Sequence, residues 1–181
     1  MSHCHDLWNT WFLGVQTVQY WSDLLLWDRF LAAHPGIRTI IELGSGRGGM
    51  SLYLRLQTLQ RDQVFLTCDR IPMEAANTPG GRLLQLSACQ RRGDIFADPL
   101  SVISPYDHPL LLFCDAGDKP REFRTFVPIL QPGDWVAVHD AGTEFSETSV
   151  DPVRRLVKRT FADECKAFDA LTWFYERVEE S

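Results

Sequence analysis

A glycine-rich segment at residues 42–49 carries the clearest chemical signal in this sequence of 181 residues. Its glycines at 44, 46, 48 and 49 follow a short apolar run, so the backbone can turn sharply there and approach a ligand closely. Gly44, Gly46 and Gly49 fit the G-x-G-x-x-G spacing of dinucleotide-binding loops, and Asp69 stands about 20 residues further on, where an acid would bind a ribose. The segment therefore predicts a nucleotide-type cofactor.

Glu42 separates two kinds of cofactor. Its carboxylate stands two residues before Gly44, where it would repel a pyrophosphate but attract a ligand that carries an ammonium and a sulfonium. The resulting E-x-G-x-G-x-G pattern resembles the first motif of class I S-adenosylmethionine-dependent methyltransferases. The resemblance implies that Glu42 helps to hold the amino acid end of the cofactor. It also implies contacts from the loop residues Gly44, Ser45, Gly46 and Gly48.

Two further acids extend this match to the rest of the cofactor. Asp69, next to Arg70, ends an apolar run, where a carboxylate can accept two hydrogen bonds from ribose hydroxyls. The alternative for Asp69 is a turn or cap carboxylate ahead of Pro72. Asp94 and Ile95 resemble the family's third motif, in which an acid reaches the adenine amino group and apolar neighbours flank the ring. A plain turn aspartate is the alternative for Asp94.

Three segments of the second half are distinctive: 111–123, 130–135 and 138–140. Together they resemble the cephalosporin hydroxylase and macrocin O-methyltransferase group. In those relatives, acids at the ends of two strands hold a divalent cation, and position carries this role over to Asp115 and Asp140, with His139 beside them. Asp115 is also expected to contact the cofactor. The alternatives are that Asp115 only contacts the cofactor or caps the next helix, and that Asp140 caps its own loop.

These residue types fit methyl transfer to oxygen. A hydroxyl must lose its proton to attack a sulfonium methyl, and Mg²⁺ on the acceptor oxygen would lower that oxygen's pKa. His139 could act as the general base, because an unperturbed imidazole titrates near neutrality, but an imidazole ligand is softer than Mg²⁺ prefers. Lys119 stands near the place of a basic lysine in catechol-type enzymes, four residues after Asp115 instead of three. Its catalytic role is therefore open.

Alternating strands and helices must position these residues. We expect strands at 38–43, 64–68, 93–96, 109–114 and 135–138. One helix is expected to end before residue 34, and others to cover 50–60, 120–130 and 150–160, whereas 82–88 is expected to form a helix or a turn. Segments 165–168 and 171–177 would close the sheet as an antiparallel pair. The pattern predicts one α/β domain over 1–181, Rossmann-like and doubly wound, with a mostly parallel sheet and an antiparallel C-terminal strand.

Residues 1–35 are predicted to form an aromatic-rich helical segment. At helical spacing its tryptophans fit the core, and those left over would form a lid over the methyl-donor site. The acceptor site would combine this segment with the loops 70–82 and 141–150.

Composition narrows the functional class. A net charge of −6 argues against a general phosphate-binding face, so nucleic acid is not an expected partner. No apolar run approaches the ~20 residues that span a bilayer, and no secretory signal is evident, so we expect a cytoplasmic protein without membrane contact. Five cysteines without a C-x-x-C pair fit reduced thiols. The group His3, Cys4 and His5 is interpreted as a frayed terminus and not as a metal site.

The sequence thus predicts a methyltransferase that uses S-adenosylmethionine and acts on a hydroxyl of a small molecule, with a divalent cation as a candidate second cofactor. Two alternatives stay open: an NAD(P)-dependent oxidoreductase on the same glycine loop, and a non-catalytic module that binds S-adenosylmethionine. The expected partners are a small-molecule acceptor and, compatible with the sequence, a second copy of the chain.

Overall fold

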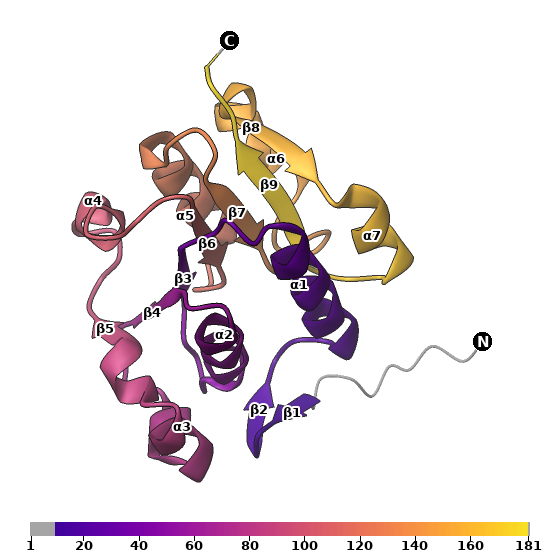
Figure 1. Cartoon of the computed structure of the whole chain (residues 1–181). Coiled ribbons are helices and arrows are strands. Elements are labelled where there is room, and N and C mark those ends of the chain that lie inside the picture. Colours follow the sequence, from indigo (N-terminus) through magenta and orange to yellow (C-terminus); the bar gives the residue numbers. More distant parts are fainter. Residues whose placement is uncertain (1–9, 181) are drawn as a thin grey trace.

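A seven-stranded mixed sheet runs through the computed structural model, which describes residues 10–180 (Figure 1). The strands lie in the order β5-β4-β3-β6-β7-β9-β8. Their bounds are Thr39–Leu43 (β3), Val64–Asp69 (β4), Gln90–Arg92 (β5), Leu110–Cys114 (β6), Trp135–Val138 (β7), Val157–Thr160 (β8) and Trp173–Arg177 (β9). Neighbours from β5 to β7 are parallel, whereas β9 is antiparallel to both β7 and β8. The predicted Rossmann-like fold class is confirmed.

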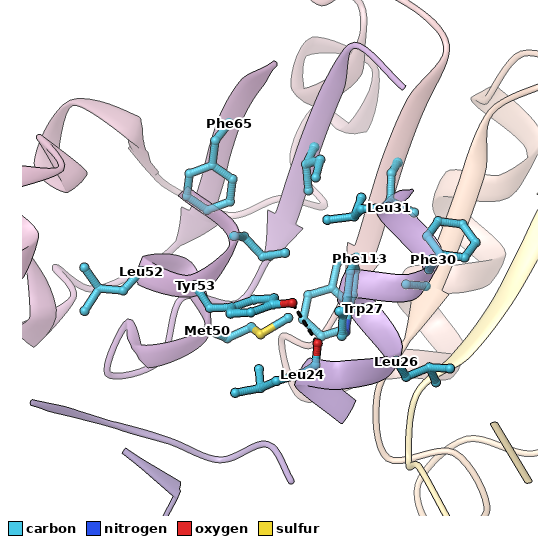
Figure 2. Close-up of a cluster of buried hydrophobic side chains, with 14 of the residues drawn as sticks. Leu24, Leu26, Trp27, Phe30, Leu31, Met50, Leu52, Tyr53, Phe65 and Phe113 are labelled. Carbon is cyan, nitrogen blue, oxygen red and sulfur yellow. Dashed lines mark hydrogen bonds between the residues drawn. The ribbon is translucent and has the colours of Figure 1, made fainter. Parts of the chain in front are cut away.

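Helices cover both faces of this sheet. Their bounds are Trp21–Ala33 (α1), Gly49–Gln60 (α2), Pro79–Leu83 (α3), Pro99–Ile103 (α4), Lys119–Phe126 (α5), Glu147–Val150 (α6) and Ala162–Ala167 (α7). On one face, Trp27 of α1 packs edge-on against Phe113 of β6 with ring centroids 4.9 Å apart, and the Tyr53 hydroxyl of α2 donates to the Leu24 carbonyl oxygen at 2.7 Å (Figure 2). On the other face, Phe123 of α5 lies in a second apolar cluster. The fold is therefore doubly wound.

The strand register places the predicted site residues at one edge of the sheet. Leu43 aligns with Cys114, and Cys114 aligns with Val138, so β3, β6 and β7 end together. Every residue of β3 and β6 is buried, as expected for parallel strands covered on both faces. The chain leaves β3 for β4 on one side and returns to β6 on the other, which makes this edge the topological switch point where such sheets bind ligands.

The N-terminal segment differs from the predicted helix. Its described part begins with a hairpin of β1 (Thr10–Phe12) and β2 (Val15–Thr17), and only α1 is helical. Leu13 and Gly14 form the connecting turn, both with positive φ (49° and 80°), a backbone conformation that matches the twist of a two-residue hairpin. The helical interpretation of the whole 1–35 segment was therefore wrong for residues 10–17.

The aromatic residues of this segment divide between core and surface. Trp27 is fully buried, as the core interpretation predicts, whereas Trp11 and Trp21 are more than half exposed. Trp8 and the group His3, Cys4 and His5 lie outside the described residues. A lid made by the exposed tryptophans stays a prediction.

The third predicted strand is displaced. β5 covers 90–92, ahead of the expected 93–96, and pairs with β4. The Asp94 carboxylate accepts a hydrogen bond from the Phe96 backbone N–H at 2.9 Å, so the chain turns where a strand was expected. Of the helix or turn predicted over 82–88, the structure shows the end of α3 and a 3-10 turn, which Gln85 separates by its left-handed conformation.

The C-terminal third departs furthest from the sequence pattern. In place of a helix over 150–160, α6 passes into a 3-10 turn at Asp151–Leu156 that contains Pro152, and then into β8. Segment 165–168, predicted as a strand, largely belongs to α7. The partner strand of β9 is therefore β8, not 165–168. The predicted helix over 120–130 ends at Phe126 and continues as a 3-10 turn.

Two features of the described residues concern the predictions about membrane contact and reduced thiols. None of their helices is both long and apolar enough to cross a bilayer. Their four cysteines are buried free thiols, and burial raises the pKa of Cys68 to about 12 and that of Cys165 to about 11. Thiols with such pKa values are unreactive at neutral pH.

Candidate active site

The glycine loop after β3 passes directly against the end of β6. Gly44 adopts a φ of +94°, and a Cβ there would lie 2.5 Å from Ala116 Cα and would overlap the Asp115 carbonyl oxygen. The Asp115 N–H also donates to the Leu43 carbonyl oxygen at 2.9 Å. The close backbone approach requires glycine and holds the loop beside Asp115.

Replacing Gly44 with alanine is expected to lower the free energy of unfolding by ~1–3 kcal/mol, because the new Cβ meets backbone atoms and the residue must keep a left-handed conformation. Gly46 is the matched control, since its φ is +48° and nothing lies within 4 Å of an added Cβ. Gly46→Ala should lower the stability by only about 1 kcal/mol. Urea unfolding followed by tryptophan fluorescence measures both, and equal losses would show that the contact with Asp115 has no energetic weight.

Glu42 presents an unsatisfied carboxyl group to the site. The side chain is fully buried, and Ser51 Oγ donates to its Oε2, but its Oε1 has no hydrogen-bond partner among the described residues. Burial raises the pKa of Glu42 from 4.5 to about 8. A ligand that brings a cationic N–H donor would satisfy Oε1 and favour the ionised form.

Two cavities meet at Gly44. One holds about 290 Å³ and lies on the β4 and β5 side, where its walls include Asp69, Arg70, Ile95, Phe96 and Ala116. The other holds about 240 Å³ and is lined by Glu42, the glycine loop and the charged residues Asp115, Lys119, His139 and Asp140. The predicted cofactor residues thus divide between two adjoining spaces that share the start of the loop.

The position and contacts of Asp69 fit both of its predicted roles, the turn carboxylate and the ribose ligand. Its Oδ1 accepts from the N–H groups of Arg70 at 2.6 Å and Ile71 at 3.2 Å, which is turn behaviour, and its Oδ2 accepts from the Gly46 N–H at 3.1 Å. The residue also lines the larger cavity. Because each carboxylate oxygen can accept more than one hydrogen bond, these contacts leave room for ribose hydroxyls.

The residues predicted to contact adenine lie on the same side of the site as Asp69. Ile95 and Phe96 line the larger cavity, and the Arg121 guanidinium stacks over the Phe96 ring at 3.8 Å. Asp94 is not among the residues that line that cavity; one of its carboxylate oxygens accepts from Phe96 N–H and the other lies 3.7 Å from Arg70. An adenine contact by Asp94 stays a prediction, and its turn role is what the structure displays.

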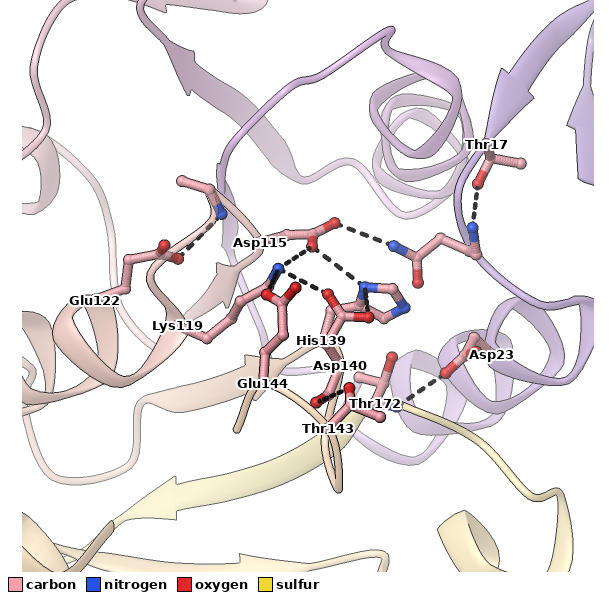
Figure 3. Close-up of polar contacts among 12 residues, drawn as sticks. Thr17, Asp23, Asp115, Lys119, Glu122, His139, Asp140, Thr143, Glu144 and Thr172 are labelled. Carbon is pink, nitrogen blue, oxygen red and sulfur yellow. Dashed lines mark hydrogen bonds and ion pairs between the residues drawn. The ribbon is translucent and has the colours of Figure 1, made fainter. Parts of the chain in front are cut away.

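Five charged side chains converge at the ends of β6 and β7 (Figure 3). The Lys119 Nζ lies 2.7 Å from Asp140 Oδ2, 2.8 Å from Glu144 Oε2 and 3.8 Å from Asp115 Oδ1. His139 Nδ1 lies 3.2 Å from Asp115 Oδ1 and 3.4 Å from Asp140 Oδ1. The fold therefore brings together all four residues predicted for catalysis or metal binding.

The electrostatics of this cluster favour its cationic forms. Burial lowers the pKa of His139, but the carboxylates of Asp115 and Asp140 outweigh it and raise that pKa to about 10. The hydrogen bond with His139, together with Lys119, holds the pKa of Asp140 below its usual range. In this arrangement His139 is a proton donor at neutral pH, so its predicted role as general base requires a change in the surrounding charge.

The capping alternatives can be compared with the observed contacts. The residue that caps α5 is Asp118, whose Oδ1 accepts from the Arg121 N–H at 3.1 Å, and not Asp115. At Asp140 the backbone carbonyl oxygen accepts from the loop that follows, including the Thr143 N–H at 3.1 Å, while the side chain faces Lys119. Both carboxylates are therefore directed into the cluster.

Sequence reasoning did not identify Gln19 as a site residue. Gln19 is buried between β2 and α1, and its Nε2 donates to Asp115 Oδ2 at 3.1 Å. Its place at the site depends on the hairpin, which the aromatic pattern did not predict. Glu144 follows Asp140 by four residues, close enough in the sequence to be a candidate for a further ligand, and the structure places its carboxylate 2.8 Å from Lys119 Nζ.

Comparison with known proteins places the fold but not the family. No protein-family model and no curated protein matches the sequence. Among solved structures, "CmcI-N160 apo-structure" has a TM-score of 0.70 at 17% identity, with 94% of this chain and 76% of that chain covered. "cmcI-D160 Mg-SAM" has a TM-score of 0.66 at 16% identity, with 94% and 77% covered. The O-methyltransferase TomG from Streptomyces achromogenes, solved with SAM, has a TM-score of 0.54 at 17% identity, with 87% and 79% covered.

Proposed function

We propose that this protein is a methyltransferase that binds S-adenosylmethionine and transfers its methyl group to a hydroxyl of a small molecule. The observation that carries the proposal is Glu42: a buried carboxyl group with one unsatisfied oxygen, directly beneath a glycine loop at the switch point of the sheet. The ammonium of a methionine moiety would donate to Oε1 and favour the ionised form of Glu42, whereas a pyrophosphate brings negative charge and no hydrogen-bond donor. Proteins of the same fold include enzymes solved with this cofactor.

The two cavities fit the two ends of such a cofactor. The larger cavity offers Asp69 for ribose hydroxyls and the apolar faces of Ile95 and Phe96 for a purine. The smaller cavity offers Glu42 for the amino acid end and opens onto Asp115 and its charged neighbours. A methyl group carried between them would face the cluster, where an acceptor hydroxyl would be aligned for in-line attack.

The residues present also fit a divalent cation. Ligand atoms of Asp115, His139 and Asp140 all lie within 4.8 Å of one another, and two carboxylates with an imidazole form a usable oxygen and nitrogen donor set. When bound, such an ion would lower the pKa of an acceptor hydroxyl. Gln19 would orient Asp115 in either case, because it holds the carboxylate oxygen that faces away from the cluster.

Equilibrium titration separates the proposed function from its main rival. S-adenosylhomocysteine should bind by isothermal titration calorimetry and NAD⁺ should not, since only the former places a cation beside Glu42. The reverse result would favour the oxidoreductase. Transfer of a labelled methyl group to any hydroxyl-bearing acceptor would exclude a purely binding module. A small-molecule acceptor and a cytoplasmic setting complete the proposal, supported by the size of the cavities and by the reduced cysteines.

Asp69→Ala is expected to weaken binding of S-adenosylhomocysteine by ~1–3 kcal/mol, because the ribose hydroxyls lose their acceptor. The matched control is Asp163→Ala, an exposed aspartate in the first turn of α7. Calorimetric titration of both variants measures the effect. An unchanged affinity in Asp69→Ala would show that this carboxylate serves only the turn.

A further inference from the structure

A positive charge already occupies the point at which the acidic side chains converge. The Lys119 ammonium is held by Asp140 at 2.7 Å and by Glu144 at 2.8 Å, and it lies 3.8 Å from Asp115. The side chain is only 6% exposed, so this is not a solvated surface pair. Lys119 is the first residue of α5, where the Asp118 cap and the helix start fix its backbone.

The carboxylates that hold the lysine are the same ones that would hold a divalent ion. Asp115 and Asp140 belong to both sets of contacts. The ammonium lies 2.7 Å from Asp140 Oδ2 and 3.8 Å from Asp115 Oδ1, so it already neutralises part of their negative charge. A divalent ion on the same two carboxylates would place two further positive charges beside the ammonium. Like charges in a buried site repel strongly, which favours exchange over coexistence.

We propose that Lys119 is the resident cation of this site and competes with divalent metal ions for Asp115 and Asp140. Metal binding then requires the ammonium to leave Asp140, and the site stays assembled when no metal is bound. Glu144 can stay paired with the ammonium after it leaves Asp140, because the Glu144 side chain is 56% exposed and extends from the loop after β7. The inference rests on the metal-binding part of the proposed function.

The direct test is Mn²⁺ binding to Lys119→Met, measured by electron paramagnetic resonance without cofactor or acceptor. Mn²⁺ shares the oxygen-ligand preference of Mg²⁺ and is observed directly. The variant should bind Mn²⁺ at least about tenfold more tightly than the unmodified protein, because the competing charge is gone. Lys166→Met, which removes an exposed lysine from α7, is the matched control and should leave the affinity unchanged.

A second variant keeps the test valid if Lys119→Met does not fold. Lys119→Met alone leaves three carboxylates together, so it should unfold at a lower temperature without metal and recover when Mn²⁺ is added. The double variant Lys119→Met/Glu144→Gln removes one charge of each sign and should retain the tighter Mn²⁺ binding with less loss of stability. Equal Mn²⁺ affinity in the folded double variant and the unmodified protein would overturn the proposal.

The unmodified protein provides a readout that needs no variant. Acylation of lysines, followed by mass spectrometry, should label Lys119 slowly without metal and several-fold faster in Mn²⁺ at a concentration that fills the site. The rates at the exposed Lys158 and Lys166 should not change. Bound Mn²⁺ with Lys119 still protected would contradict the exchange. Titration with S-adenosylhomocysteine tests the proposed function separately. The protein could fail to bind this ligand and still exchange Lys119 for Mn²⁺, or bind it and show no exchange.

Discussion

Glu42→Gln is expected to stabilise the cofactor-free protein by ~2–4 kcal/mol at about pH 9, while weakening its binding of S-adenosylhomocysteine by ~1–3 kcal/mol. The ionised carboxylate is costly in the empty site because it is fully buried with one oxygen unsatisfied. A neutral amide avoids that cost, and the hydroxyls of Ser51 and Thr67 can reorient to serve it. The same change removes the anion that a cofactor ammonium would need.

The sign of the pH dependence follows from the direction of the pKa shift. Folding raises the pKa of Glu42 from 4.5 to about 8, so the folded state keeps a proton that the unfolded chain has released. The contribution of Glu42 to stability is complete below pH 4.5 and is lost as the pH rises through 8. The advantage of Glu42→Gln should therefore grow across that window. Urea unfolding at several pH values measures it.

Glu122 supplies the contrasting buried glutamate. It is also fully buried, with a pKa that burial raises to about 7, but both its oxygens accept backbone hydrogen bonds, from Ala116 and Asp118. Glu122→Gln puts an amide where one acceptor is needed and should destabilise the protein. If Glu42→Gln also destabilises the cofactor-free protein at high pH, the unsatisfied carboxylate of Glu42 is not a reserved ligand site.

The central half of the sheet was predictable because its strands are continuous buried apolar runs. In β3, β4, β6 and β7 that pattern has one interpretation, and each run stops at the residue that enters the site. Asp69, Asp115 and Asp140 could thus be assigned to one edge before their distances were known. Fold class and candidate site followed from the same signal.

The edges were not predictable for a physical reason. β8 has one apolar residue followed by three polar ones, so its sequence does not distinguish a strand from a helix, and only its pairing with β9 decides between them. The hairpin at β1 and β2 depends on positive φ at Leu13, which its residue type does not indicate. Gln19 owes its contact with Asp115 to that hairpin, so local misassignment concealed a site residue.

Lys119 illustrates a second limit. Its spacing from Asp115 departs from the pattern of catechol-type enzymes, which left its role open. The structure shows why spacing was the wrong measure: the lysine begins α5 and reaches across to Asp140 and Glu144 on the loop after β7. Its partners are distant from it in the sequence, so no local motif could identify them.

Asp134 shows that a motif shared with an enzyme group need not belong to its site. It stands in the distinctive segment 130–135 but lies at the amino end of β7, opposite the carboxyl ends that form the cavities. Its carboxylate accepts from the N–H groups of Leu110 at 2.8 Å and Gln131 at 2.7 Å, and lies 2.7 Å from His108 Nδ1. Through these contacts, the buried Asp134 carboxylate connects the start of β6 to the start of β7.

Asp134→Ala is accordingly expected to lower the free energy of unfolding by ~3–5 kcal/mol, since it leaves backbone donors without an acceptor and an imidazole without its partner. Asp134→Asn keeps one acceptor oxygen and should lose less. Guanidinium unfolding measures both, with Asp163→Ala as the exposed control. Affinity for S-adenosylhomocysteine should be unchanged wherever the variant is folded, because the cavities lie at the other edge. A loss under about 1 kcal/mol would mean that water replaces the carboxylate at little cost.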